Sequence, residues 1–268
     1  MRRVLVGLSV LIWQCASPAQ AADPREALAR ARVLYNQGQF DAAVTAAEEA
    51  RTAPDLASAA DLIAARAELE RHRASAAPDD LVRARERLGR IDPRRFTPVE
   101  RLEFVVGLGQ ALYFDGSTGA SAVVFESVLS GPHALPPEAR ERVLDWWANA
   151  LDRDAHPRPD IERQGVYQRI RDRMASELAA RPGNSVASYW VSAAARGQGD
   201  LQAAWDAAQA AWVNASLSTD SGVALRADLD LLMERAIIPE RSRMLALPPD
   251  TLTEEWRRFK EKWTKPPL

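Results

Sequence analysis

The sequence predicts an all-α fold, a solenoid of about five helical hairpins that ends in capping helices. Apolar residues recur at intervals of three and four along the chain, whereas the alternation typical of strands is nearly absent. Proline and glycine fall between these runs and delimit about a dozen helices of about 11 to 18 residues. The boundary prolines are Pro54, Pro78, Pro93, Pro98, Pro136, Pro137, Pro157, Pro159, Pro182 and Pro239.

The first 21 residues are typical of a secretory signal peptide. Arg2 and Arg3 supply a positive start, residues 4–13 are apolar, and Ala19-Gln20-Ala21 is a small-x-small cleavage site. The apolar run is too short for an ordinary membrane span. We therefore expect cleavage after Ala21 and a periplasmic or secreted protein.

Cys15 is the single cysteine of the chain, so the mature protein would contain none. Lipidation of Cys15 is an alternative, but Trp13 and Gln14 fit that processing site poorly. Without other cysteines we expect no disulfide and no thiolate metal site, and packing alone must hold the fold. No later apolar run is long enough for a transmembrane helix.

Three segments share a pattern of small residues around a glycine. Aligning Gly38, Gly116 and Gly199 places a small residue seven positions before each glycine and another five positions after it. The matching positions are Ala31, Gly109 and Ser192; Ala43, Ser121 and Ala204; Ala47, Phe125 and Ala208; Ala50, Val128 and Ala211. Such recurrence indicates a repeat architecture.

This pattern resembles the tetratricopeptide repeat family, in which small residues let the two helices of a hairpin approach closely. Leu108-Gly109 keeps the Leu-Gly pair of the family, and Pro182-Gly183-Asn184 resembles its turn between repeats. The sequence departs from the family at Arg30, where leucine is usual, and no copy has the early tryptophan. The resemblance implies hairpins at residues 24–51, 101–130 and 185–213.

The spacing of the three glycines predicts two more hairpins. Gly38 and Gly116 are 78 residues apart, and Gly116 and Gly199 are 83 apart, about two repeat lengths each. One divergent hairpin should fill each gap, with helices at 57–73 and 79–91 and at 137–154 and 160–180.

The C-terminal region should close the stack. We expect a helix at Leu225–Ile237 that completes a solenoid over residues 22–238, followed by a linker and capping helix over residues 239–268. A capping box, Thr251 with Glu254, should begin the last helix. Its aromatic face should cover the final repeat, with docking to a partner or a membrane as the alternative. This face comprises Trp256, Phe259 and Trp263.

Composition and motifs argue against several functional classes. Without Arg2 and Arg3 the chain has 33 basic and 37 acidic residues, interleaved, which is atypical of nucleic-acid binding. The histidines His72, His133 and His156 lack metal-ligand spacing. No nucleophile elbow or P-loop occurs, and Gly107-Leu108-Gly109 is read as a helix-packing site. We expect no enzyme activity, metal or cofactor.

Aromatic residues suggest a binding surface. Trp146 and Trp147 are adjacent, so on a helix one should enter the core while the other reaches a groove. In the tetratricopeptide repeat family the first helix of each hairpin lines a concave face that binds peptides, and the resemblance implies that role here. The implied contacts are Arg32, Tyr35, Asn36, Gln110, Tyr113, Phe114, Tyr189, Trp190 and Arg196.

The expected function is therefore a non-catalytic scaffold that binds a protein or peptide partner in the bacterial cell envelope. Two alternatives remain open. The chain could be the superhelical accessory domain of a cell-wall enzyme system, or a module that binds a glycan or small ligand through its tryptophans.

Overall fold

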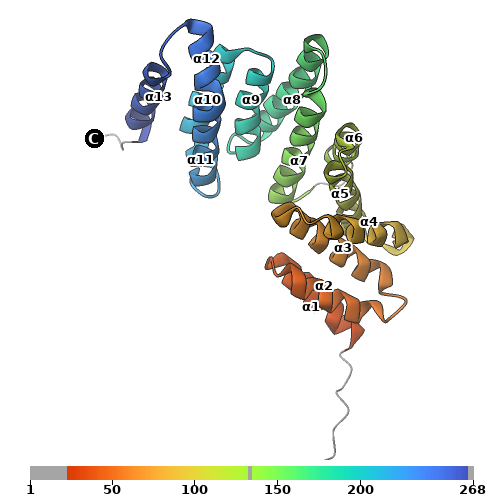
Figure 1. Ribbon diagram of the computed structural model, residues 1–268. Helices are drawn as coiled ribbons and strands as arrows, with labels where there is room; N and C mark the ends of the chain where they lie inside the picture. The colour runs from red at the N-terminus through yellow and green to blue at the C-terminus, as the bar shows by residue number, and fades with distance from the viewer. Residues whose placement is uncertain (1–22, 132–134, 265–268) are drawn as a thin grey trace, which may run out of the picture.

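The computed structural model describes residues 23–131 and 135–264, and these residues form helices α1 to α13 with no strand among them (Figure 1). The predicted signal peptide, Cys15 and His133 lie outside the described residues. Five hairpins come first: α1 (Pro24–Asn36) with α2 (Phe40–Arg51), α3 (Ala57–Ser75) with α4 (Pro78–Arg90), α5 (Pro98–Phe114) with α6 (Thr118–Leu129), α7 (Pro137–Ala155) with α8 (Asp160–Ala180), and α9 (Ser185–Gly197) with α10 (Leu201–Asn214). The predicted all-α solenoid of hairpins is confirmed.

The helices stack in two layers. Each of the odd-numbered helices from α1 to α9 packs against the next odd-numbered helix, and even-numbered helices fill the spaces between them. Successive odd-numbered helices contact one another more than successive even-numbered helices do. The odd-numbered layer therefore lies on the inner side of the stack's curvature. We call the surface of this layer that faces away from the even-numbered helices the odd-helix face.

The three aligned glycines form equivalent turns. Gly38, Gly116 and Gly199 have φ values of +74°, +85° and +78°, a left-handed conformation that residues with a side chain rarely adopt. In each turn the residue after glycine donates its N–H to a carbonyl five residues earlier, at 2.9, 2.9 and 3.1 Å. The repeat found in the sequence thus corresponds to one recurring turn geometry.

Small residues bring the helices of two hairpins into close contact. The Ser121 hydroxyl donates to the Gly109 carbonyl at 2.8 Å, and the Ser192 hydroxyl donates to the Ala204 carbonyl at 2.7 Å. A Cβ on Gly109 would lie 2.7 Å from the ring of Phe125. These aligned positions are small because a larger side chain would push the helices apart.

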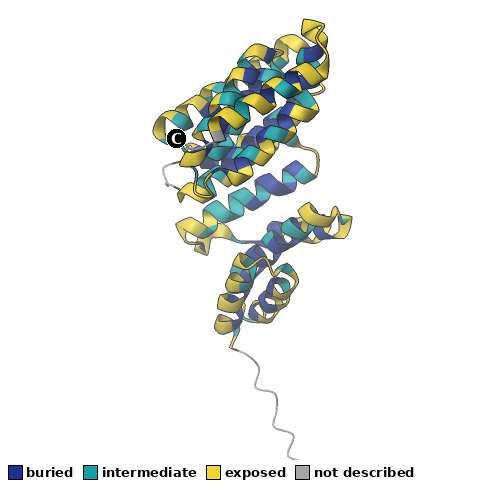
Figure 2. Ribbon diagram, turned by 90° about the vertical axis from the view of Figure 1, so that its left-hand side faces the viewer, coloured by how far each residue is buried: buried dark blue, intermediate teal, exposed yellow. Residues whose placement is uncertain are grey.

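The apolar core runs between the layers along the stack, as the buried residues in Figure 2 show. Its largest cluster lies in the third and fourth hairpins and on α9, where Trp147 is only 1% exposed. Trp146 is partly exposed and packs at the edge of the same cluster. The prediction that these adjacent tryptophans diverge is confirmed.

The linker expected from residue 239 begins instead as helix. α11 (Val223–Leu232) continues through a π-helical turn, Met233–Ile237, into α12 (Ile238–Leu245). Pro239 has no N–H and cannot donate to the carbonyl four residues earlier. The wider π turn directly before it accommodates this missing bond, so the chain passes the proline without leaving the helix.

The predicted capping box of the last helix is wrong. α13 (Pro249–Thr264) begins two residues before Thr251, whose N–H donates to the Pro248 carbonyl, while Glu254 pairs with Arg257 and Arg258. A capping box begins α5 instead, where Thr97 and Glu100 exchange hydrogen bonds of 3.2 and 3.0 Å.

The last helix covers the end of the stack with one aromatic side chain. Trp256 is buried against Trp205 and Trp212, with ring centroids 6.2 and 5.4 Å apart. Phe259 stacks on Trp256, whereas Trp263 is 53% exposed. Trp256 therefore acts as the expected cap, and a docking role for this helix stays a prediction.

Candidate functional site

A pocket of about 280 Å³ opens on the odd-helix face between α1, α3, α5 and α7, and we call it the N-terminal pocket. Its walls are mostly apolar, with a charged rim. It is lined by Tyr35, Arg66, Glu70, Val99, Leu102, Glu103, Val106, Gln110, Leu135, Pro136, Ala139, Arg142, Val143 and Trp146. Four successive odd-numbered helices therefore contribute to one concave site.

The rim of the N-terminal pocket is held in place by charge pairing. The Arg66 guanidinium lies 4.4 Å from the centroid of the Tyr35 ring and forms a 2.8 Å ion pair with Glu103. Burial raises the pKa of the Tyr35 hydroxyl above its usual value of 10. These contacts place a flat aromatic surface and an arginine beside each other.

Trp146 forms one wall of this pocket. Its indole packs edge-to-face against Tyr113 and Phe114, with centroids 4.9 and 5.5 Å apart. Such packing orients an aromatic ring and reduces its freedom before a ligand binds. The pocket therefore combines a rigid aromatic wall with aliphatic side chains.

A second pocket of about 510 Å³ lies on the same face between α7, α9 and α11, and we call it the C-terminal pocket. It is lined by Asp145, Asn149, Asp152, Ser185, Val186, Tyr189, Trp190, Ala193, Arg196, Ala224, Leu225, Asp228 and Leu232. Asp145 and Trp146 are neighbours on α7, so the two pockets flank this helix.

The C-terminal pocket is acidic. The Asp145 carboxylate accepts a 2.9 Å hydrogen bond from the Trp190 indole and one from Asn149, and Asp152 accepts from the Tyr167 hydroxyl at 2.8 Å. Burial, and secondarily the charge of Asp228, raise the pKa of Asp145. Burial likewise raises the pKa of Asp228.

The structure brings five of the nine predicted contacts to the two pockets. Tyr35 and Gln110 line the N-terminal pocket, and Tyr189, Trp190 and Arg196 line the C-terminal one. Arg196 also forms a 2.6 Å ion pair with Glu240 of α12. A binding role for these residues remains a prediction, since their placement alone does not identify a ligand.

The other four predicted contacts lie elsewhere. Arg32 pairs with Glu100 at 2.5 Å and lines a separate pocket of about 370 Å³ near the α2–α3 turn, and Asn36 is exposed at the end of α1. Tyr113 is only 7% exposed, beneath the guanidinium of Arg153. Phe114 packs against His72 and Trp146.

Sequence reasoning missed several pocket residues. Asp145, Asn149 and Asp152 follow one another at i, i+4 and i+7, the spacing of one helix face, and this polar stripe could have been read from the sequence. Arg66 and Asp228 carry no such signal, because their place in the pockets depends on packing between distant hairpins.

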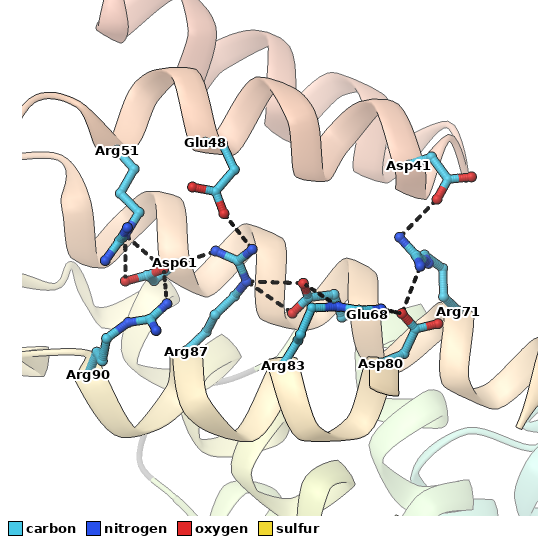
Figure 3. A network of polar contacts seen from close by, with 10 residues as sticks. All are labelled: Asp41, Glu48, Arg51, Asp61, Glu68, Arg71, Asp80, Arg83, Arg87 and Arg90. Carbon is cyan, nitrogen blue, oxygen red and sulfur yellow. Dashed lines mark hydrogen bonds and ion pairs between the residues drawn. The ribbon is translucent and has the colours of Figure 1, made fainter. Parts of the chain in front are cut away.

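Apart from the two pockets, a cluster of charged side chains lies between α2, α3 and α4, and in it each carboxylate is paired with at least one arginine (Figure 3). Arg87 is at its centre and contacts Glu48, Asp61 and Glu68 at 2.5, 3.2 and 3.0 Å. The outer members extend the network on both sides: Arg51 and Arg90 on Asp61, Arg83 on Glu68 and Asp80, and Arg71 between Asp41 and Asp80. Because these carboxylates already have cations, we interpret the network as a junction between hairpins rather than a ligand site.

A metal-binding group of side chains is not found in the described part of the chain. There, no three side chains of His, Cys, Asp or Glu come together in a group that could hold a metal ion. His72 hydrogen-bonds the Ala77 carbonyl and His156 the Asp152 carbonyl, each through Nδ1. No helix in the described ranges is both long and apolar enough to cross a bilayer.

Comparisons with known proteins give no further guide. No protein-family model matches the chain, and searches of curated proteins and of solved structures also found no match. The resemblance to tetratricopeptide repeats therefore continues to depend on the residues quoted above.

Proposed function

We propose that this protein is a non-catalytic scaffold of the bacterial cell envelope that binds an extended segment of a partner protein along its odd-helix face. The observation that carries the proposal is the position of the N-terminal and C-terminal pockets. Both open on one face, on either side of α7, and together they draw on α1, α3, α5, α7, α9 and α11. A segment laid across successive helices could fill both.

The composition of the pockets supports protein recognition. Tyr35, Trp146, Tyr189 and Trp190 supply aromatic surface, and Arg66 supplies a guanidinium held by an ion pair. Tryptophan, tyrosine and arginine are enriched in binding hot spots. Tyrosine and tryptophan offer a large contact area at a small entropic cost, and the arginine guanidinium is a preorganised fork of donors. Their placement on helices rather than loops favours a preorganised site.

The sequence supports the location and mode of action. The N-terminal segment is typical of a signal peptide, which favours the periplasm or the exterior. The resemblance to tetratricopeptide repeats favours peptide binding by the first helix of each hairpin. The first helices are the odd-numbered ones, so the resemblance and the pockets favour the same surface.

Capture of partners from the native cell envelope, followed by mass spectrometry, tests the proposal with matched variants. Val99 on α5 is 65% exposed and lines the N-terminal pocket, whereas Val123 on α6 is 64% exposed on an even-numbered helix. Val99→Glu should deplete the captured partners, and Val123→Glu should retain them. Equal capture by both variants would contradict binding at the odd-helix face.

Binding of a cell-wall glycan is the alternative that the pocket tryptophans leave open. Trp146 and Trp190 each line one pocket, so a bound muropeptide should quench tryptophan fluorescence. A protein scaffold predicts no saturable quenching by muropeptides. Saturable quenching that is lost in Trp146→Phe would favour the glycan function instead.

A further inference from the structure

The C-terminal pocket has negative charge that its own residues do not balance. Asp145 and Asp152 on α7 and Asp228 on α11 all line it. Arg196 is the one basic residue in its lining, and its guanidinium is engaged by Glu240, with hydrogen bonds of 2.6 to 3.1 Å. Among the described residues, Asp228 forms no ion pair.

These carboxylates lie close enough to affect one another. Beyond the effect of burial, the charge of Asp228 raises the pKa of Asp145, although the two residues come from different hairpins. The pKa of the Tyr189 hydroxyl is raised by burial and then by Asp228, Asp145 and Asp152. A cation placed among these groups would relieve the repulsion that they exert on one another.

The pocket also contains aromatic surface that suits a cation. Tyr189 and Trp190 meet edge-to-face, with centroids 5.6 Å apart and planes at 89°, so the two rings face different directions. The N–H of Trp190 is directed to Asp145. A guanidinium or ammonium group near an aromatic face and a carboxylate gains from both.

The N-terminal pocket differs in its charge balance. Its two basic residues, Arg66 and Arg142, match its two acidic residues, Glu70 and Glu103, and the remaining wall is largely apolar. That pocket fits an uncharged apolar side chain. The two ends of the odd-helix face therefore have different ligand preferences.

We infer that the C-terminal pocket binds an arginine or lysine side chain of the partner segment. This inference rests on the proposed function and specifies its ligand: an extended peptide with a basic residue for the pocket between α7, α9 and α11. The occupant follows from charge complementarity, because Asp228 and its neighbours supply anionic groups beside aromatic rings.

Selection from a random peptide library on the purified protein provides the probe. We expect selected peptides to be enriched in arginine and lysine. The tightest arginine peptide is then synthesised with a fluorescent label, together with a version in which citrulline replaces arginine. Citrulline keeps the shape of arginine without its charge, so the pair isolates the ionic contribution to binding measured by anisotropy.

The two peptides are titrated against matched variants of the protein. Asp228→Asn should weaken the arginine peptide about tenfold and leave the citrulline peptide almost unchanged. Glu86→Gln removes the same charge from an exposed position on α4, outside both pockets, and should affect neither peptide. The effect of Asp228→Asn on the arginine peptide, relative to its effect on the citrulline peptide, should become smaller at high salt, because ions screen the pairing of the two charges.

The outcomes separate this inference from the proposed function. Selected peptides without basic enrichment, weakened by Val99→Glu but indifferent to Asp228→Asn, would overturn the inference and leave the binding face intact. Recovery of no peptide, or of peptides indifferent to both substitutions, would overturn the proposed function and this inference together.

Discussion

Arg87 is the cation at the centre of the ion-pair network between α2, α3 and α4, and Arg87→Met should destabilise this junction. Methionine preserves much of the aliphatic length but removes the charge from between Asp61 and Glu68, whose side chains are 4% and 1% exposed. A buried carboxylate without a cation is costly, because water cannot solvate it there.

The size of the effect follows from the partners that remain. Loss of one member of a buried ion pair typically costs about 3 to 5 kcal/mol. Arg51 and Arg90 stay within 3.2 and 3.1 Å of Asp61, and Arg83 stays 3.7 Å from Glu68, so we expect about 3 kcal/mol. For a chain of this size the melting temperature should fall by about 6 to 12 °C.

Circular dichroism melts at neutral pH measure this change, and hydrogen exchange locates it. Solenoids unfold in local units, so amide protection should fall first in α2, α3 and α4. Arg85→Met is the matched control on the same helix, because Arg85 is 54% exposed and pairs with Asp115 at the surface. Its effect should stay within about 1 kcal/mol.

Acidification adds a second readout of the same variant. Burial raises the pKa of Glu68, and this effect is larger than the lowering of the pKa by the charge and hydrogen bond of Arg87. Removing Arg87 should raise the pKa of Glu68 further. At low pH Glu68 is then protonated and its buried charge is neutralised. The difference in melting temperature between Arg87→Met and wild type should therefore become smaller at low pH. Melts of Arg87→Met and Arg85→Met that coincide at neutral pH would show that the network does not stabilise the junction.

Three further substitutions concern stability. Burial raises the pKa of Glu177, but the hydrogen bonds and charges of Arg140 and Arg173 together outweigh it and hold the pKa below its usual value of 4.5. Glu177 therefore stabilises the fold above that pH and less as pH falls. Melts of Glu177→Gln should lie below wild type at neutral pH and converge with it as the pH falls through the lowered pKa of Glu177. Gly109→Ala should destabilise by about 1 to 3 kcal/mol, because its Cβ would lie 2.7 Å from the Phe125 ring. Gly165→Ala in α8 meets open space and should stabilise by about 0.5 to 1 kcal/mol, measured by the same melts.

Each of these predictions has a clear contrary result. An unchanged difference between Glu177→Gln and wild type across the acid range would exclude the ionic contribution of Glu177. Equal melting temperatures for Gly109→Ala and Gly165→Ala would show that the close approach of α5 and α6 is not a constraint.

The hairpin architecture was predictable because its determinants are local. A left-handed turn needs glycine, so Gly38, Gly116 and Gly199 marked equivalent turns in the sequence. Small residues at fixed distances from each glycine marked the sites where helices approach, as Gly109 and Ser121 show. Both signals depend on neighbouring residues, which a sequence displays directly.

The pockets were less predictable because they form between hairpins. Tyr113 was expected to contact a partner, but the packing of α5 against α6 and α7 buries it. The sequence did not indicate which of Trp146 and Trp147 would reach a groove, and this packing leaves Trp146 at the pocket wall. The α11–α12 junction was missed for a related reason. Pro239 usually indicates a break, and only the preceding π turn lets the helix continue.

Site-specific photo-crosslinking in the native cell envelope tests whether the odd-helix face is the binding surface. A photoreactive phenylalanine derivative is placed at Val99 on the odd-helix face, and at Val82 and Val123 on even-numbered helices, three valines that are all more than half exposed. The proposed function predicts discrete crosslinked partners from Val99 and none of them from Val82 or Val123. The same adducts from Val82 or Val123, with none from Val99, would contradict it and place the binding surface on the even-numbered helices.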